Sequence, residues 1–202
     1  MGSLTEDGES NIMATAEAIW SFYNETNDLA SVTTPTLPTG YHHLKVMIAG
    51  GGTSITGYYT YWIIQFNSDT GTNYWMNNHI EANGTAYAAI YPSSAEGQLG
   101  SDETHCDQRG SDTHPLYANP SSGLILDIYG QDNSSADTSY MENGAWNFGS
   151  RTDVGNSAKV FYKYLQMGNW TNTADITSMK FDLDNGYINR GTSIDIYGYK
   201  SS

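Results

Sequence analysis

The densest run of residue types that could bind a metal lies between Asp102 and His114. Four carboxylates in it are weak candidates for calcium ligands: Asp102, Glu103, Asp107 and Asp112. Calcium takes about six or more oxygen ligands, and the run has no loop of the EF-hand pattern. The alternative is zinc on His105, Cys106 and His114, but these are only three ligands and their spacing matches no standard zinc site. We therefore interpret the run as a solvated acidic loop and expect no metal or cofactor.

Catalytic groups are not visible elsewhere in the sequence. Glycoside hydrolysis uses two carboxylates about 5–10 Å apart, and the glutamates are scattered along the chain with nothing to pair them. No Gly-x-Ser-x-Gly nucleophile motif occurs, and the histidines and Cys106 form no recognisable catalytic signature. We predict that the protein is not an enzyme.

Aromatic side chains are the feature that could recognise a ligand, because sugar rings stack on exposed aromatic faces. The chain holds 16 Tyr and 5 Trp. Most of those between Tyr58 and Tyr91 belong to alternating segments, which place them in a core or at a subunit interface. Trp146 and Trp170 are flanked by Asn and Gly in expected loops, and they are the better candidates for contact with a glycan or a partner.

Composition excludes several classes of protein. The chain of 202 residues has a formal charge of −14, whereas proteins that bind nucleic acid carry clustered Lys and Arg. No run of about 18 apolar residues is present, so we expect no membrane-spanning helix. The N-terminus lacks the basic and apolar regions of a secretory signal, which indicates synthesis in a cytoplasm.

Most of the chain after residue 40 alternates between apolar and polar residues, as β-strands do. Leu44, Val46 and Ile48 share one face of such a segment. Strands are expected at 43–48, 58–66, 74–76, 86–91, 123–129, 159–167, 176–183 and 193–199. Residues 67–71 are expected to close a hairpin between the second and third of these strands, and 92–122 to form a surface excursion. Short strands with frequent turns and little helix predict an all-β fold, an antiparallel, jelly-roll-like β-sandwich.

The first 37 residues differ from the rest. Ile12, Ala16, Ile19 and Tyr23 have the spacing of an amphipathic helix, but the segment 19–23 is equally compatible with a strand. Pro35 and Pro38 favour an extended linker. We expect a short N-terminal arm over residues 1–37, which contacts a neighbour or forms the first element, and a sandwich domain over residues 38–202.

Four segments stand out as motifs: Pro38–Val46, Phe66–Tyr74, Trp170–Met179 and Arg190–Gly198. Together they resemble motifs of a family of virion proteins of tailed bacteriophages. In order and spacing they are similar to that family's IP-x-x-Y-x-H-L, F-N-G-D-T-G-x-N-Y, W-x-x-T-x-A-I-T-S-I and A-G-S-x-x-x-L-Y-G. Departures are Ser68 in place of Gly, an inserted Asp175, and Thr192–Ser193 in place of a pair of small residues.

The resemblance implies a non-enzymatic structural protein of a tailed-phage particle. Within that class we expect a capsid-associated decoration, head-fibre or knob protein. The alternative is a tail-fibre or receptor-binding module that binds carbohydrate on the host surface. Such proteins assemble as homo-oligomers, with a trimer favoured, and contact other virion proteins of the capsid or tail. The expected location is the virion, after synthesis in the host cytoplasm, with no nucleic acid or membrane as a partner.

Overall fold

The regular elements of the protein are β-strands throughout the part of the chain that is described. The computed structural model describes residues 16–26, 29–50, 52–54, 62–71, 73–82, 85–89, 107–108, 123–130, 138–147, 161–183 and 186–200. None of these residues belongs to a helix, and so none forms a helix long and apolar enough to cross a membrane.

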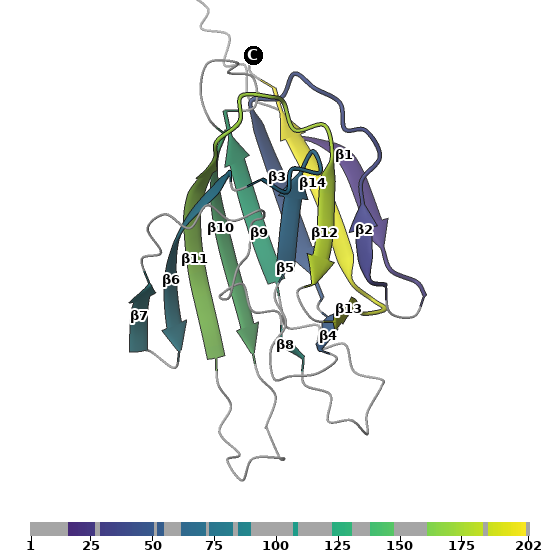
Figure 1. Ribbon diagram of the computed structural model, residues 1–202. Helices are drawn as coiled ribbons and strands as arrows, with labels where there is room; N and C mark the ends of the chain where they lie inside the picture. The colour runs from purple at the N-terminus through teal and green to yellow at the C-terminus, as the bar shows by residue number, and fades with distance from the viewer. Residues whose placement is uncertain are drawn as a thin grey trace, which may run out of the picture.

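A large antiparallel sheet forms the back of the molecule in Figure 1. Its eight strands follow the order β1 (Ala16–Tyr23), β14 (Ser193–Tyr199), β3 (His43–Ala49), β9 (Gly123–Tyr129), β10 (Thr138–Asn147), β11 (Phe161–Trp170), β6 (Tyr74–Ala82) and β7 (Thr85–Ala89). The large sheet therefore contains both the first and the last strand of the described chain.

A second antiparallel sheet lies in front of β14, β3 and β9, whereas β6 and β7 extend beyond it (Figure 1). Its three strands follow the order β2 (Ser31–Thr33), β12 (Met179–Leu183) and β5 (Trp62–Phe66). A third, small sheet at one end joins β13 (Gly186–Ile188), β4 (Gly52–Ser54) and β8 (Asp107–Gln108), and its β4–β8 pair is parallel.

The core lies between the two antiparallel sheets. Leu44, Val46 and Ile48 of β3 are buried, as their alternation predicts, and they face the buried alternate residues of β5 and β12 across the sandwich. The neighbouring strands contribute Leu124, Leu126, Ile128, Ile194 and Ile196 to the same cluster. The expected all-β, antiparallel β-sandwich is confirmed. The chain changes between these two sheets several times, among others between β3 and β5, between β5 and β6 and between β12 and β14.

The hairpin expected at residues 67–71 is wrong. β5 pairs with β12, whereas β6 pairs with β11 and β7, so the segment carries the chain from one sheet to the other. Phe66 before it and Tyr74 after it both point into the core. Short polar residues do fix the turn, since Asn67 and Ser68 adopt φ angles of 51° and 57°, a left-handed conformation that Asn tolerates better than most residues.

Strand β10 was not expected from the sequence. It reads Thr-Ser-Tyr-Met-Glu-Asn-Gly-Ala-Trp-Asn, without an alternating apolar face. β10 nevertheless pairs along its length with both β9 and β11. A central strand forms backbone hydrogen bonds with both of its neighbours whatever its side chains are. The tertiary context therefore outweighs the weak β-propensity of these residues.

The segment near residue 20, for which the sequence was compatible with either a helix or a strand, forms the strand β1. It pairs with β14 from Ala16↔Tyr199 to Tyr23↔Ser193, with a β-bulge between Ala18 and Trp20. β2 belongs to the second sheet, and Leu37 is buried in the core. Residues 16–26 and 29–37 of the expected arm are thus integrated into the sandwich, while residues 1–15 and 27–28 lie outside the described residues.

Candidate functional site

Most of the acidic run lies outside the described residues, including Asp102, Glu103 and Asp112 and the zinc candidates His105, Cys106 and His114. Asp107 belongs to the short strand β8, but only its backbone is described. Among the side chains that are described, no three His, Cys, Asp or Glu residues converge as metal ligands.

Trp170, expected to be exposed, is fully buried, so that prediction is wrong. It is the last residue of β11, and its ring packs edge-on against Phe66 at 5.5 Å and stacks with Tyr74 at 6.4 Å between centroids. The flanking Asn and Gly mark the end of a strand, not an exposed loop. Trp146, also expected in a loop, lies in β10 opposite Tyr162, and its side chain is outside the described part.

Asp69 holds the one polar atom of the buried Trp170 ring. Its Oδ2 accepts a 2.8 Å bond from Trp170 Nε1 and a 2.9 Å bond from Asn73 Nδ2, and its Oδ1 accepts a 2.8 Å bond from the Gly71 amide. Burial acts to raise the pKa of Asp69, but the hydrogen bonds from Asn73, Trp170, Gly71 and Asn172 outweigh it and lower the pKa below its ordinary value. The carboxylate therefore stays charged and rigidly held.

Asn67 holds together the same corner, which is the place where residues 66–74 meet residues 170–178. Its Oδ1 accepts bonds from the amides of Thr177 (2.8 Å) and Ser178 (3.1 Å), and its Nδ2 donates to the Asp175 carbonyl at 2.8 Å. Tyr74 completes the corner: its hydroxyl accepts the Phe66 amide at 2.9 Å, and burial raises its pKa. The segments 66–74 and 170–178, two of the phage-like motifs, thus form one joint.

The other two phage-like motifs meet at the strand pair β3–β14. A Cβ at Gly198 would lie 2.4 Å from the Tyr41 ring, so only Gly lets that ring pack so closely. The Tyr41 hydroxyl donates a 2.6 Å bond to Glu17 Oε2, which raises the pKa of Tyr41, and Lys200 Nζ also bonds Glu17, at 2.9 Å. This second joint ties the start of β1 to the end of β14.

The outward face of the large sheet carries a row of three stacked rings on neighbouring strands. His43 lies 4.7 Å from Tyr129 and 4.7 Å from Tyr199 between centroids, with interplanar angles of 11° and 18°. This separation matches the spacing of about 4.8 Å between strands, so the rings stand on the sheet and cover one another's faces. The row presents mainly ring edges to solvent, which is a poor platform for stacking a sugar.

Beside the row runs a pair of charges, and beyond it an apolar pair. Asp127 Oδ1 lies 2.9 Å from His43 Nε2 and 3.2 Å from Lys45 Nζ. Met47 and Ile125 are directly paired in the β3–β9 register, and they are 41% and 38% exposed. We call the outward residues of β14, β3 and β9 the outer face: Ser193, Asp195, Tyr197, Tyr199, His43, Lys45, Met47, Ala49, Gly123, Ile125, Asp127 and Tyr129.

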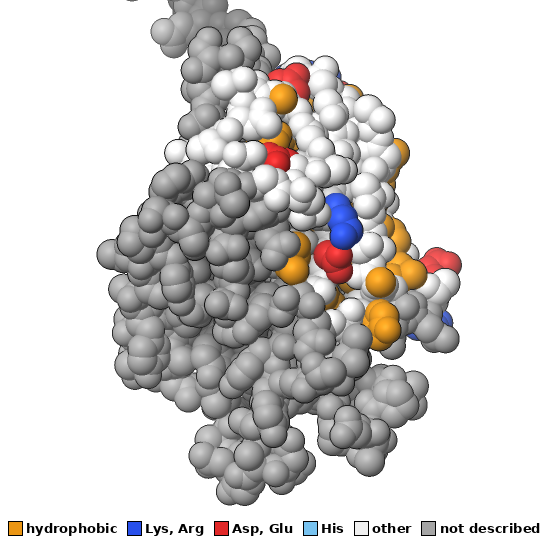
Figure 2. All heavy atoms as spheres, viewed as in Figure 1, with side chains coloured by type: hydrophobic (Ala, Val, Ile, Leu, Met, Phe, Trp, Pro, Cys, Tyr) orange, Lys and Arg blue, Asp and Glu red, His pale blue; other side chains and the backbone are white. Residues whose placement is uncertain are grey.

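The opposite side of the molecule has a different character. Figure 2 shows that uncharged polar side chains and backbone dominate the described surface over the three-stranded sheet. Lys180 and Asp182 form an ion pair there, at 2.6 Å. Such pairs between partly exposed side chains contribute little, about 0–1 kcal/mol.

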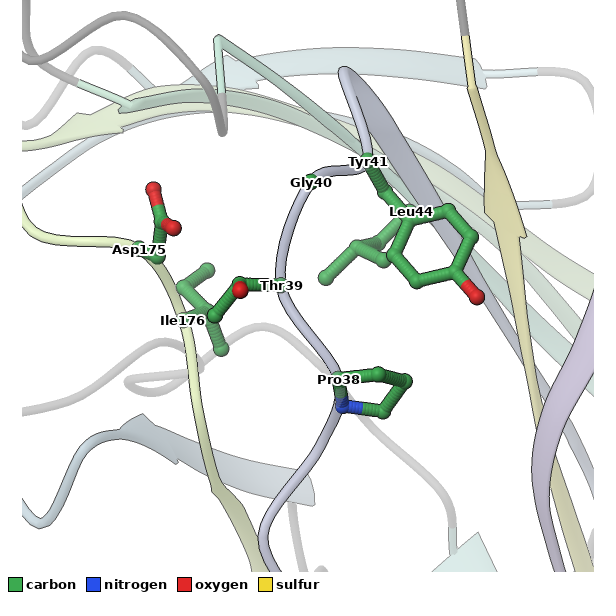
Figure 3. Close-up of a pocket in the computed structure, with 7 residues that line it drawn as sticks. All are labelled: Pro38, Thr39, Gly40, Tyr41, Leu44, Asp175 and Ile176. Carbon is green, nitrogen blue, oxygen red and sulfur yellow. The ribbon is translucent and has the colours of Figure 1, made fainter.

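A shallow hollow lies where residues 38–41 meet residues 175–176 (Figure 3). It has no space for a water molecule. Figure 3 shows the Ile176 side chain turned toward the 38–41 loop and the Asp175 carboxylate turned away from it. The hollow is a crease between two of the phage-like motifs, too tight to hold a ligand.

The outer face was missed by sequence reasoning. Its signal was the set of alternate residues in 43–48, 123–129 and 193–199, which include His43, Tyr129 and Tyr199. That signal shows which residues share a face within one strand, but the order β14–β3–β9 is needed to bring the three rings together.

Comparisons of the chain with protein families, with curated proteins and with solved structures find no match.

Proposed function

We propose that the chain is a non-enzymatic structural protein of a tailed-phage particle, which acts by stoichiometric assembly on the capsid as a decoration, fibre or knob protein. The observation that carries the proposal is the pairing of the four phage-like motifs in space. Asn67 joins the second motif to the third, and Tyr41 packs on Gly198 to join the first to the fourth. The resemblance thus rests on residues that build the framework of a sandwich.

Charge also supports this role. Copies of a protein with a formal charge of −14 repel one another in solution. A protein displayed at high density on a shell stays soluble for that reason and does not cross-link particles. The negative charge therefore disfavours aggregation of free copies and is compatible with binding of each copy to a fixed template.

The alternative, a tail-fibre or receptor-binding module for host glycans, loses one of the aromatic residues that were expected to contact a glycan. Trp170 is buried with its indole nitrogen bonded to Asp69, so it cannot stack on a sugar. Tyr129 is exposed and Tyr199 is half-buried, and the His43 ring between them covers one face of each. Assembly is therefore the better-supported function.

The test is titration of the purified chain onto heads of a tailed phage that lack their decoration protein. We expect saturable binding at a fixed ratio to capsid subunits and a higher temperature for release of the packaged DNA. Heads that already carry their full complement are the control, and they should not bind the chain. Failure to bind or to stabilise the undecorated heads would sink the capsid role.

A glycan array separates the alternative from the proposal. Binding to host surface polysaccharide, together with no binding to heads, would favour the receptor-binding module. A decoration protein should bind the heads and leave the array blank.

A further inference from the structure

Strand β1 is an edge strand of the large sheet, and one of its sides has no partner strand among the described residues. It pairs with β14 on one side only, from Ala16 to Tyr23. Figure 1 shows β1 at the margin of the sheet, and the neighbouring β2 belongs to the other sheet. An open edge presents a row of backbone N–H and C=O groups, which another extended chain can pair with. The partner that fits this edge is therefore a β-strand.

The length and residue types of β1 leave this edge open to pairing. β1 has eight residues, whereas the other edge strands of the two antiparallel sheets have three (β2) or five (β5 and β7). Edges are commonly protected by lysine, proline, a bulge or a short strand, and β1 contains neither lysine nor proline. A bulge between Ala18 and Trp20 is present, and the regular stretch Trp20–Tyr23 follows it. Five side chains of β1 are exposed: Ala16, Glu17, Ala18, Ser21 and Tyr23.

The charge of β1 favours a second copy of β1 as that strand. Glu17 is the only charged residue of β1, and Lys200 Nζ offsets it at 2.9 Å, although the whole chain carries −14. In an antiparallel pair over the whole strand, position 17 of one copy lies opposite position 22 of the other. The two Glu17 residues are then separated by about 16 Å along the strands, which exceeds the screening length of about 8 Å at physiological ionic strength. A parallel pair would place them side by side.

From these observations we propose that β1 pairs antiparallel with β1 of a second copy, so that the two large sheets join edge to edge across a twofold axis. Trp20 stacks on Phe22 at 6.0 Å and on Phe181 of β12 at 6.2 Å between centroids, so β1 is held in place before a partner binds. The dimer differs from the trimer that the resemblance implies, because an edge that pairs with itself closes with two copies. The inference concerns how two copies meet, and it stands or falls apart from the role on the capsid.

Sedimentation of the purified full chain tests the dimer without any phage component. At hundreds of micromolar protein we expect a species of twice the 22.2 kDa chain mass. In the antiparallel pair Ala18 lies opposite Ser21 of the partner subunit, so Ala18→Glu with Ser21→Glu sets like charges face to face, as does Ala18→Lys with Ser21→Lys. Each double variant should sediment as a single chain, with association weakened at least tenfold. An equimolar mixture of the two should form dimers again, because Glu then faces Lys.

The matched control adds the same two negative charges away from the edge. Ile125→Glu with Tyr187→Glu places them on β9 and β13, at side chains that are 38% and 40% exposed. This variant should still form the dimer. Circular dichroism must show the same fold in all variants.

Hydrogen exchange of backbone amides tests the edge without any substitution. Amides on the open side of β1 exchange rapidly in a single chain, and they should exchange several-fold more slowly at high than at low protein concentration, because the partner strand accepts their hydrogen bonds. Amides of β14, which lies between β1 and β3, are the internal reference. The proposal is overturned by a single chain at every concentration, by a trimer, by a dimer of the Glu variant, by a mixture of the Glu and Lys variants that stays single, or by β1 exchange that is independent of concentration. Protection of β1 only on phage heads would also overturn it, in favour of a capsid strand at this edge.

Discussion

Replacing Asp69 with Asn should destabilise the protein although the two side chains have almost the same shape. The carboxylate accepts bonds on both oxygens, from the Gly71 amide at 2.8 Å on Oδ1 and from Trp170 Nε1 at 2.8 Å on Oδ2. An Asn side chain has one oxygen and one NH₂ group. Whichever way it turns, its NH₂ group faces a donor that the carboxylate had satisfied.

The magnitude follows from that lost partner. The favoured orientation keeps the Asn oxygen on the buried Trp170 Nε1 and turns the NH₂ group toward the exposed Gly71 amide, so one hydrogen bond is lost, at a cost of about 1 kcal/mol. The remaining bonds also weaken by roughly 1 kcal/mol, because they lose the charge on the acceptor. A total of about 2 kcal/mol corresponds to a melting temperature lower by roughly 4–8 °C for a domain of this size.

Thermal unfolding at pH 7, followed by circular dichroism, measures the loss. Asp175→Asn is the matched control, because Asp175 lies in the same corner and uses its main-chain carbonyl, not its carboxylate, to bond Asn67. We expect a change within about 0.5 kcal/mol for that variant. Equal melting temperatures for the two variants would refute the assignment of Asp69 as the group that holds the corner.

Acid supplies an independent check on Asp69. Its pKa is lowered from 3.8 in the folded protein, so the unfolded chain binds a proton more readily. Its contribution to stability is then fully present above about pH 4 and is lost as the pH falls through the lowered value. The difference between the wild type and Asp69→Asn should therefore be constant from pH 7 to pH 5 and shrink below pH 4.

Three further substitutions probe the second joint and other residues of the Asp69 corner, each by urea unfolding. Gly198→Ala places a Cβ 2.4 Å from the Tyr41 ring and should cost roughly 1–3 kcal/mol, whereas Gly123→Ala meets its nearest neighbour at 3.8 Å and should be nearly neutral; equal midpoints would contradict the close packing. Asn67→Gly keeps the φ of 51° without strain but removes the side-chain bonds, so a loss of about 2–4 kcal/mol is expected, and no loss would show that the bonds do not stabilise the corner. Tyr74→Phe leaves a buried amide unpaired and should cost about 1–3 kcal/mol; a neutral result would mean that the amide finds another acceptor.

The sequence correctly predicted the position and the inward residues of those strands that have one buried face and one face in solvent. The alternation in 43–48, 123–129 and 193–199 identified β3, β9 and β14, with their inward residues, because the two faces of these strands meet different environments. Strand β10 lacks that contrast, and it could not be found from a single sequence. Its position is set by pairing with β9 and β11, which local residue types do not encode.

The corner at residues 66–74 shows a second limit. Asn67-Ser68-Asp69-Thr70-Gly71 has the composition of a turn, and residue types alone do not distinguish a turn within one sheet from a turn between two. The same limit hid the burial of Trp170. Asn and Gly beside it suggested a loop, but the ring is covered because Asp69, about a hundred residues earlier in the chain, satisfies its nitrogen. Partners that distant are visible only in the fold.

The place of β14 in the large sheet has a consequence for biosynthesis. The last described strand lies between β1 and β3, so Ala16 pairs with Tyr199 across nearly the whole chain. While the protein is still being translated, β1 has no neighbour in the sheet and one edge of β3 stays open. Closure over so long a separation is slow, and it begins only when residues 193–199 have left the ribosome. Chains that stop before Ser193 keep an unpaired edge, which makes them prone to aggregation, and only chains that reach Tyr199 can complete the sheet.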